Sequence, residues 1–196
     1  MSGNRIPKIA SKPPIVIVLF FLTIGISYAV DDGFCPARKI EGKYFTVYYN
    51  PPLDIFSLNQ QLNIHFSEQI MAGEPMKKDN SPEAELTGML DTLFMRVCDI
   101  LDMHLYSFQG KIKICQDSKQ LNKIYNNLFN KEPNIKSFYV YSFNTIYISK
   151  DDFKREILGH EIAHAIISHY FVVQAPVKIQ EVLAMYVEYQ LRRVGK

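Results

Sequence analysis

Two histidines and a glutamate stand at a spacing suited to metal chemistry: His160-Glu161-Ile162-Ala163-His164. Residues four apart lie on one face of an α-helix, so the two imidazoles are preset as a pair of nitrogen ligands. Catalytic zinc sites use three protein ligands and keep a fourth position for water, and a neighbouring glutamate can take that water's proton. The pattern therefore predicts Zn²⁺ held by His160 and His164, with Glu161 as general base, which is hydrolase chemistry.

The third ligand has few candidates. After His164 the chain contains two carboxylates, Glu181 and Glu188, and one further imidazole, His169. His169 follows His164 by five residues and so points away from the ligand face of the same helix. Glu181 falls in the second turn of the next predicted helix, after a loop long enough to reverse the chain. We therefore expect Glu181 as the third metal ligand, and Glu188, two turns further on the same face, as a candidate partner of the ligands.

The motif His160-Glu-x-x-His164, followed on the next helix by Glu181, resembles that of the gluzincin metallopeptidases, especially their short, peptidase MA-like members. The likeness covers roughly residues 138–192. It implies a zincin-like fold, zinc held by His160, His164 and Glu181, and Glu161 as general base and proton shuttle. It also implies that the substrate is a peptide or protein, cleaved by metal-activated water.

Two related groups do not fit. The metzincin pattern would need Gly at position 167 and His at position 170, where this chain has Ile167 and Tyr170. An aspartate-liganded zincin is excluded because no Asp follows Asp152. The sequence also ends soon after the glutamate helix, so we expect it to lack the carboxy-terminal half-domain that closes the cleft in larger gluzincins.

The role of the remaining polar residues is open at this stage. The tetrahedral oxyanion of such a reaction needs a further hydrogen-bond donor. The candidates are Tyr139, Tyr141, Tyr147, His169 and Tyr186.

An alternative function is a non-catalytic module that binds a peptide or an envelope partner on the same scaffold, although the intact Glu161 argues against it. A purely structural zinc would instead need a closed site of four ligands.

The elements that must position these residues follow from apolar periodicity and turn signals. Helices are predicted over residues 53–70, 83–103, 117–129, 151–170 and 176–193. Strands are predicted over residues 43–49, 111–115, 137–142 and 145–149. Strands interspersed with helices indicate an α+β fold in a single domain over residues 30–196. We expect a small mixed sheet, an active-site helix and a following glutamate helix.

Three details of this arrangement bear on the site. Phe143 and Asn144 have the spacing of a two-residue hairpin turn, and the strand after it, residues 145–149, is expected to be an exposed edge to which an extended peptide adds. Asp151 or Asp152 is expected to cap the helix that carries the histidines. Residues 71–82 are polar and contain Gly and Pro, which predicts a loop.

The amino terminus has the layout of a secretory signal peptide. Three basic residues and no acidic residue precede an apolar run from Ile15 to Ala29, and small residues favour cleavage after Ala29. The mature protein would then be exported, either to the periplasm or as a secreted protein. The alternative is an uncleaved anchor over residues 15–30 that keeps the protein on a membrane.

Charge and cysteine content limit the partners. Cleavage after Ala29 would remove three of the 22 lysines and arginines and none of the 20 acidic residues, leaving a nearly neutral protein. This balance argues against nucleic acid as a partner, and nothing in the sequence indicates an oligomeric state. Of the three cysteines, at least one cannot pair within the chain, and we expect Cys98 and Cys115 to be buried thiols.

Overall fold

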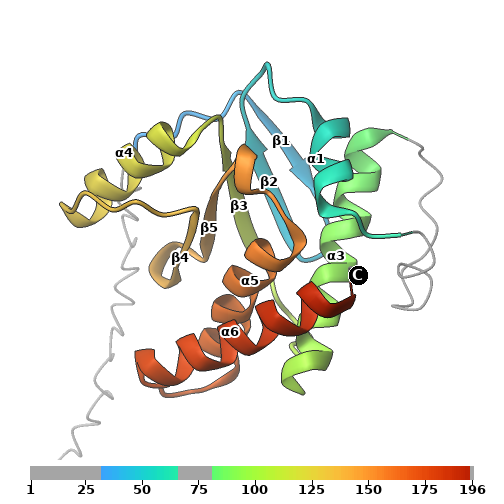
Figure 1. The fold of residues 1–196 in the computed structure, drawn as a ribbon, viewed down its shortest axis with the longest axis vertical. Coiled ribbons are helices and arrows are strands. Elements are labelled where there is room, and N and C mark those ends of the chain that lie inside the picture. The colour runs from blue at the N-terminus through green and yellow to red at the C-terminus, as the bar shows by residue number, and fades with distance from the viewer. Residues whose placement is uncertain (1–31, 66–80, 195–196) are drawn as a thin grey trace, which may run out of the picture. The chain divides into compact units, whose positions relative to one another are not determined.

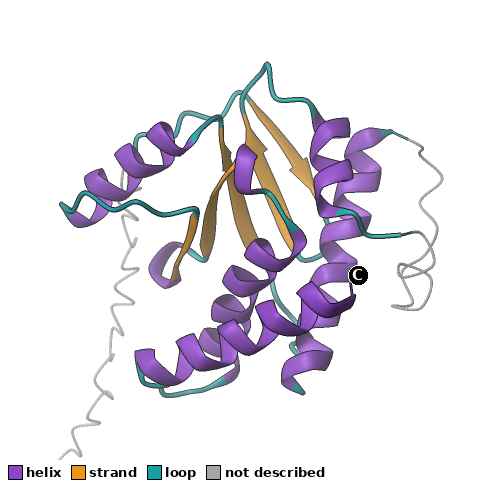
Figure 2. Ribbon diagram, in the orientation of Figure 1, coloured by secondary structure: helices purple, strands orange, loops and turns teal. Residues whose placement is uncertain are grey.

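The computed structural model describes residues 32–65 and 81–194, all of them in the unit that spans residues 31–196. These residues form the predicted α+β fold, with a small mixed sheet and five α-helices (Figure 1; Figure 2). The sheet has five strands, one more than the four predicted. The predicted signal segment, its anchor alternative and most of the predicted loop at 71–82 lie outside the described residues. Of the helices in the described part, none has both the length and the apolar character to traverse a bilayer.

The sheet places its longest strands in the middle. Its strands are β1 (Arg38–Glu41), β2 (Phe45–Tyr49), β3 (Gly110–Cys115), β4 (Ser137–Val140) and β5 (Thr145–Ser149). Their order is β1-β2-β3-β5-β4; the inner strands β2, β3 and β5 run parallel, while β1 and β4 are antiparallel edges. The expectation that the second hairpin strand is an edge is therefore wrong, because β5 lies between β3 and β4, and β4 is the edge.

Alternation along β5 divides the sheet into two packed faces. Ile146 and Ile148 join the larger core, with residues of α1, α3, α5 and α6. Tyr147 points to the opposite face, where it stacks on Phe138 of β4 at a ring-centroid distance of 4.7 Å. Successive side chains of a strand point to opposite faces, so both sides of β5 are buried. The helix α4 covers the Tyr147 face (Figure 1).

The helices begin and end at local signals. They are α1 (Ile55–Leu62), α3 (Pro82–Leu101), α4 (Ser118–Phe129), α5 (Arg155–Tyr170) and α6 (Val177–Val194). The Ser81 hydroxyl caps α3 by accepting a hydrogen bond from the backbone of Ala84. Of the predicted helix over 53–70, the structure shows α1, which stops at Asn63 in the left-handed conformation with φ 47°. Residues 66–70 of that prediction lie outside the described residues.

Two local predictions next to the histidine helix are wrong. The hairpin has a four-residue connection, a 3₁₀ turn at Tyr141–Phe143 followed by left-handed Asn144, rather than a two-residue turn. The two aspartates do not cap α5 either, because they belong to a 3₁₀ turn at Lys150–Asp152. Two residues separate that turn from the start of α5 at Arg155, and the N-cap residue Lys154 has no side-chain cap.

The cysteines carry free thiols. Cys98 and Cys115 are buried, as expected, and Cys35 is exposed. Burial raises the pKa of Cys98 to about 11 and that of Cys115 to about 12, which keeps both thiols protonated at neutral pH. These two cysteines therefore act as small apolar core residues.

Candidate metal centre

The helix α5 is enclosed by the protein over most of its surface. Its fully buried apolar residues are Leu158, Ile162, Ala163, Ala165, Ile166 and Ile167. They contact the sheet and the neighbouring helices as part of the larger core. Side chains on an element held this way keep a fixed direction, which is what a ligand pair requires.

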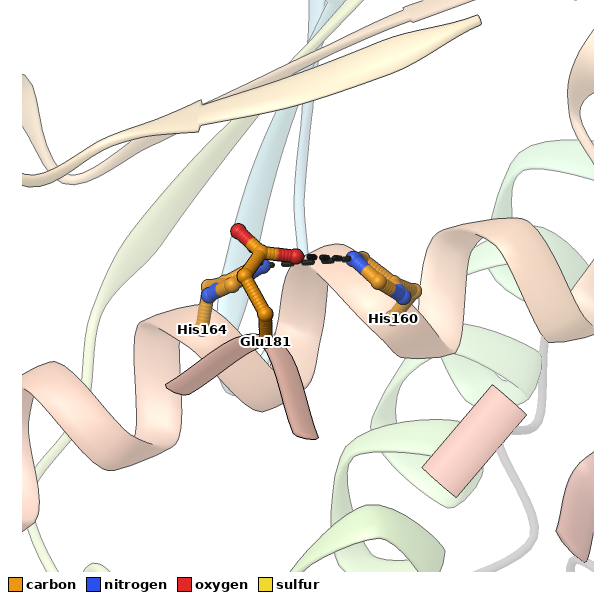
Figure 3. A group of neighbouring side chains, drawn as sticks. All are labelled: His160, His164 and Glu181. Carbon is orange, nitrogen blue, oxygen red and sulfur yellow. Dashed lines mark hydrogen bonds and ion pairs between the residues drawn. The ribbon is translucent and has the colours of Figure 1, made fainter. Parts of the chain in front are cut away.

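The two histidines of α5 face each other. The Nε2 atoms of His160 and His164 lie 3.2 Å apart, and their side chains are 19% and 13% exposed. Figure 3 shows that Glu181 of α6 points its carboxylate at this pair (Figure 3). Its Oε2 lies 3.6 Å from Nε2 of His160, and its Oε1 lies 3.5 Å from Nε2 of His164. The structure thus brings together the three predicted ligands in one group.

A tight connection between α5 and α6 turns Glu181 back toward the histidines. The side-chain amide of Gln174 donates to the carbonyl of Ser168, and that of Gln180 donates to the carbonyl of Ala175. The carbonyl of Pro176 accepts from the backbone amides of Ile179 and Gln180 in the first turn of α6. These bonds tie the six-residue connection to the last turn of α5 and to the first turn of α6, and so fix the direction in which the chain reverses.

The two helices also approach closely at Gly159, next to the first histidine. A Cβ placed on Gly159 would lie 2.1 Å from Cδ1 of Leu191, too close for any side chain without movement. Ala163 on α5 and Ala184 on α6 are small and fully buried as well. The small residues allow the backbone of α6 to come near enough for Glu181 to reach the histidine pair.

The donor set fits a zinc ion. Two donors bound at about 2.1 Å to a tetrahedral ion lie about 3.4 Å apart. The two imidazole nitrogens are 3.2 Å apart, and the nearest carboxylate oxygen of Glu181 to each, Oε2 for His160 and Oε1 for His164, lies at 3.6 Å and 3.5 Å, close to that value. Two imidazoles and one carboxylate are also the donor set of catalytic zinc sites that keep one position open.

Glu161 lies beside the group and is buried. Its Oε1 accepts a hydrogen bond from the Ser137 hydroxyl at 2.7 Å, and the backbone amide of Tyr139 donates to the same carboxylate. Burial raises the pKa of Glu161 to about 7; the charge of Glu181 adds to the rise and the two hydrogen bonds oppose it. A carboxyl with this pKa exchanges its proton near neutral pH.

Ser137 is a functional residue that the sequence analysis did not identify. The alternation of apolar residues along its strand does, however, indicate which face of the sheet its side chain occupies. In Ser137-Phe138-Tyr139-Val140 the apolar residues Phe138 and Val140 share one face of β4. Ser137 and Tyr139 must then point to the other face, where α5 lies. What the sequence does not show is that this face meets Glu161, because the pairing of β4 with α5 is a tertiary contact.

The surroundings of His164 favour its neutral form, which is the form that can bind a metal. Burial lowers the pKa of His164, and the nearby His160 lowers it further, against opposing effects of Glu181 and a hydrogen bond with Gln180. The neutral imidazole that results keeps a lone pair for a metal. On the other side of the pair, Oε2 of Glu188 lies 3.3 Å from Nδ1 of His160. This contact lies within ion-pair distance but is not a hydrogen bond in the metal-free protein. A carboxylate that accepts from that nitrogen would orient a ligating imidazole and raise its basicity.

A cavity of about 460 Å³ opens onto the group and is lined by His160, Glu161, His164 and Glu181. Of the predicted oxyanion donors, Tyr139 and Tyr141 also line it, while His169 and Tyr186 are not among its lining residues. Tyr147 is wrong as a candidate, because its hydroxyl is buried on the other face of the sheet and donates to Asp32. The Tyr139 hydroxyl donates to the Asn144 side chain at 3.1 Å, and burial raises its pKa, so it stays a proton donor.

Comparison of the chain with models of protein families, with curated protein sequences and with solved structures found no match in any of the three.

Proposed function

We propose that this protein is a zinc-dependent hydrolase that cleaves peptide bonds, with a zincin-like fold of the gluzincin type. His160, His164 and Glu181 would hold the zinc ion, and Glu161 would be the general base. The observation that carries the proposal is the convergence of two imidazole nitrogens, 3.2 Å apart, with the Glu181 carboxylate, whose oxygens lie 3.5 Å and 3.6 Å from them, beside a buried carboxyl in one cavity. When bound, zinc lowers the pKa of its water to about 7 and polarises a carbonyl.

The residues around Glu161 support its role in moving a proton. The Ser137 hydroxyl and the Tyr139 amide hold the carboxylate in place at the wall of the cavity. With a pKa of about 7, Glu161 can accept a proton from water and later return it to a leaving amine, because neither proton transfer is strongly uphill near neutral pH. Tyr139 and Tyr141 are the candidates for the donor to the developing oxyanion, since both line the cavity.

The edge strand supports an extended peptide as the substrate. β4 is an edge of the sheet and carries Ser137 and Tyr139 at the cavity. An edge strand offers unpaired backbone groups, and a peptide can add to it as a further strand. The proposal therefore moves the peptide-binding edge from residues 145–149 to residues 137–140.

The first experiment is zinc content by mass spectrometry of the purified full chain beside His164→Ala, with His104→Ala as a control for loss of an exposed histidine. One zinc per chain in the wild type and in the control, lost in His164→Ala, is the expected result. A wild type without zinc after loading would contradict the site.

The second experiment compares hydrolysis of unfolded casein by the wild type and by Glu161→Gln. We expect Glu161→Gln to keep its zinc and to lose hydrolysis, because the amide cannot accept the proton. Equal hydrolysis by both proteins would contradict the role of Glu161. Zinc binding without hydrolysis by either protein would favour the non-catalytic module that binds a peptide or an envelope partner.

A further inference from the structure

A band of exposed apolar side chains covers the outer side of α6 and the loop before it. The described residues include fourteen large apolar side chains that are exposed, and ten of these lie between residues 170 and 189. We call these ten side chains the apolar band. Its most exposed members are Val172, which is fully exposed, Val173 at 81% and Val177 at 73%. Single exposed apolar residues are ordinary, but ten of them within twenty residues of the chain indicate an interaction surface.

The helix α6 is apolar on both of its sides. Ala184, Val187 and Leu191 are buried in the larger core, on the side facing α5. Met185 and Tyr189, four residues apart, share the opposite side and are exposed. In Figure 1, α5 lies between α6 and the sheet, so this outer side faces away from the sheet (Figure 1). A surface helix of a globular protein normally has polar residues on that side.

The charges beside the band are basic. Lys178 and Arg193 are exposed at opposite ends of α6, and the Arg193 guanidinium lies 5.7 Å from the centre of the Tyr189 ring. The acidic residues of the same helix are already engaged: Glu188 accepts a hydrogen bond from Arg192 at 2.5 Å, and the Glu181 carboxylate faces the histidine pair. The complementary partner is therefore apolar and anionic.

These charges argue against a second copy of the chain as the partner. The midpoint of α6 falls between residues 185 and 186. An antiparallel pair of α6 helices that overlap along their whole length would place Lys178 of one copy opposite Arg193 of the other. Like charges directly opposite one another destabilise an interface.

We propose that the apolar band docks on the surface of a lipid bilayer with anionic headgroups. Val172 and Val173 protrude from the loop between α5 and α6, and such side chains enter fluid hydrocarbon without needing a matching pocket. The exposed Tyr186 and Tyr189 suit the boundary between headgroups and hydrocarbon. Lys178 and Arg193 can extend to the headgroups while their stems stay beside the apolar residues. The helix would then lie in the plane of the interface, independently of any metal at the candidate site.

The test uses a tryptophan reporter in the full chain, which contains no natural tryptophan. Val173→Trp places the reporter in the band. Phe56→Trp is the matched control, since Phe56 is 56% exposed and lies on α1, outside the apolar band. Vesicles of phosphatidylcholine with and without phosphatidylglycerol are added, with brominated lipids as quenchers. We expect a blue shift and quenching for Val173→Trp with the anionic vesicles, and neither for Phe56→Trp.

Both reporter proteins contain the apolar run at residues 15–29. A spectral difference between the two reporters is therefore due to the apolar band and not to that run. Adding Lys178→Gln or Arg193→Gln to Val173→Trp should weaken binding to anionic vesicles about fivefold for each charge. Three outcomes would overturn the proposal. They are no blue shift with either vesicle, an equal shift of both reporters, and a shift without lipid that grows with protein concentration, which would indicate self-association.

Discussion

The burial of Glu161 predicts how the stability of the metal-free protein depends on pH. The pKa of this carboxyl rises from 4.5 to about 7 in the folded protein. In the unfolded chain the group ionises above about pH 4.5, whereas in the folded protein it keeps its proton until about pH 7. Its contribution to stability is therefore complete below pH 4.5 and is lost as the pH rises to 7. At about 1.36 kcal/mol for each pKa unit, the loss is roughly 3 kcal/mol.

Replacement by glutamine removes this dependence, because the amide does not titrate. Urea denaturation of the wild type and Glu161→Gln, with EDTA present, gives the free energy of unfolding of each protein between pH 4 and pH 8. The difference between the two proteins should change by roughly 3 kcal/mol in favour of the variant as the pH rises. The lowered pKa of His164 acts with the opposite sign, but it is common to both proteins and so largely cancels.

The control is Glu132→Gln, which removes the same charge from an exposed loop position. We expect its pH profile to follow that of the wild type. The reasoning would be refuted if the profiles of Glu161→Gln and the wild type ran parallel, since Glu161 would then ionise in the folded protein as freely as in the unfolded chain.

Three further predictions concern the supports of the fold and site. Gly159→Ala should destabilise the protein by about 1 to 3 kcal/mol because its Cβ meets Leu191 at 2.1 Å, and in a double-mutant cycle by urea denaturation it should cost less in the Leu191→Ala background than in the wild type. Glu188→Gln should weaken zinc binding about 10-fold to 100-fold against a competing chelator, because it changes the group at Nδ1 of His160. Asp32→Asn should lower stability at pH 7 by about 1 to 3 kcal/mol. Burial raises the pKa of Asp32, but hydrogen bonds from its lysine and tyrosine partners outweigh it and hold the pKa below 3.8, so the wild type keeps this stability until the pH falls through that range.

The local spacing of the candidate site was accessible from sequence because it depends on helix geometry. His160 and His164 lie on one face of α5 for the same reason that any residues four apart do. Glu181 was reached by eliminating other donors, and the structure places its carboxylate within 3.6 Å of both imidazole nitrogens. The small residues that permit this approach, including Gly159, gave no pattern that identified them, because their role depends on which side chain of α6 lies opposite.

The order of the strands could not be predicted from local patterns. β4 and β5 are both rich in β-branched and aromatic residues, yet one is the edge and the other lies inside the sheet. The difference comes from the parallel pairing of β5 with β3, whose partners are more than thirty residues apart in the chain. β1 was missed because its residues Arg38-Lys-Ile-Glu41 are mostly polar and exposed, and it forms through pairing with β2. Tertiary pairing overrides strand propensity in these cases.

The burial that positions the site also sets the charges of its side chains. Loss of hydration lowers the pKa of His164 and raises that of Glu161, so both groups favour their neutral forms in the metal-free protein. A neutral imidazole is ready to bind a metal, but a protonated Glu161 cannot accept a proton. The ionised form of Glu161 would be stabilised by a dication held beside it. Metal binding at about pH 6 should therefore release a proton from this carboxyl, and the fraction of Glu161 in its base form would rise when the metal site is filled.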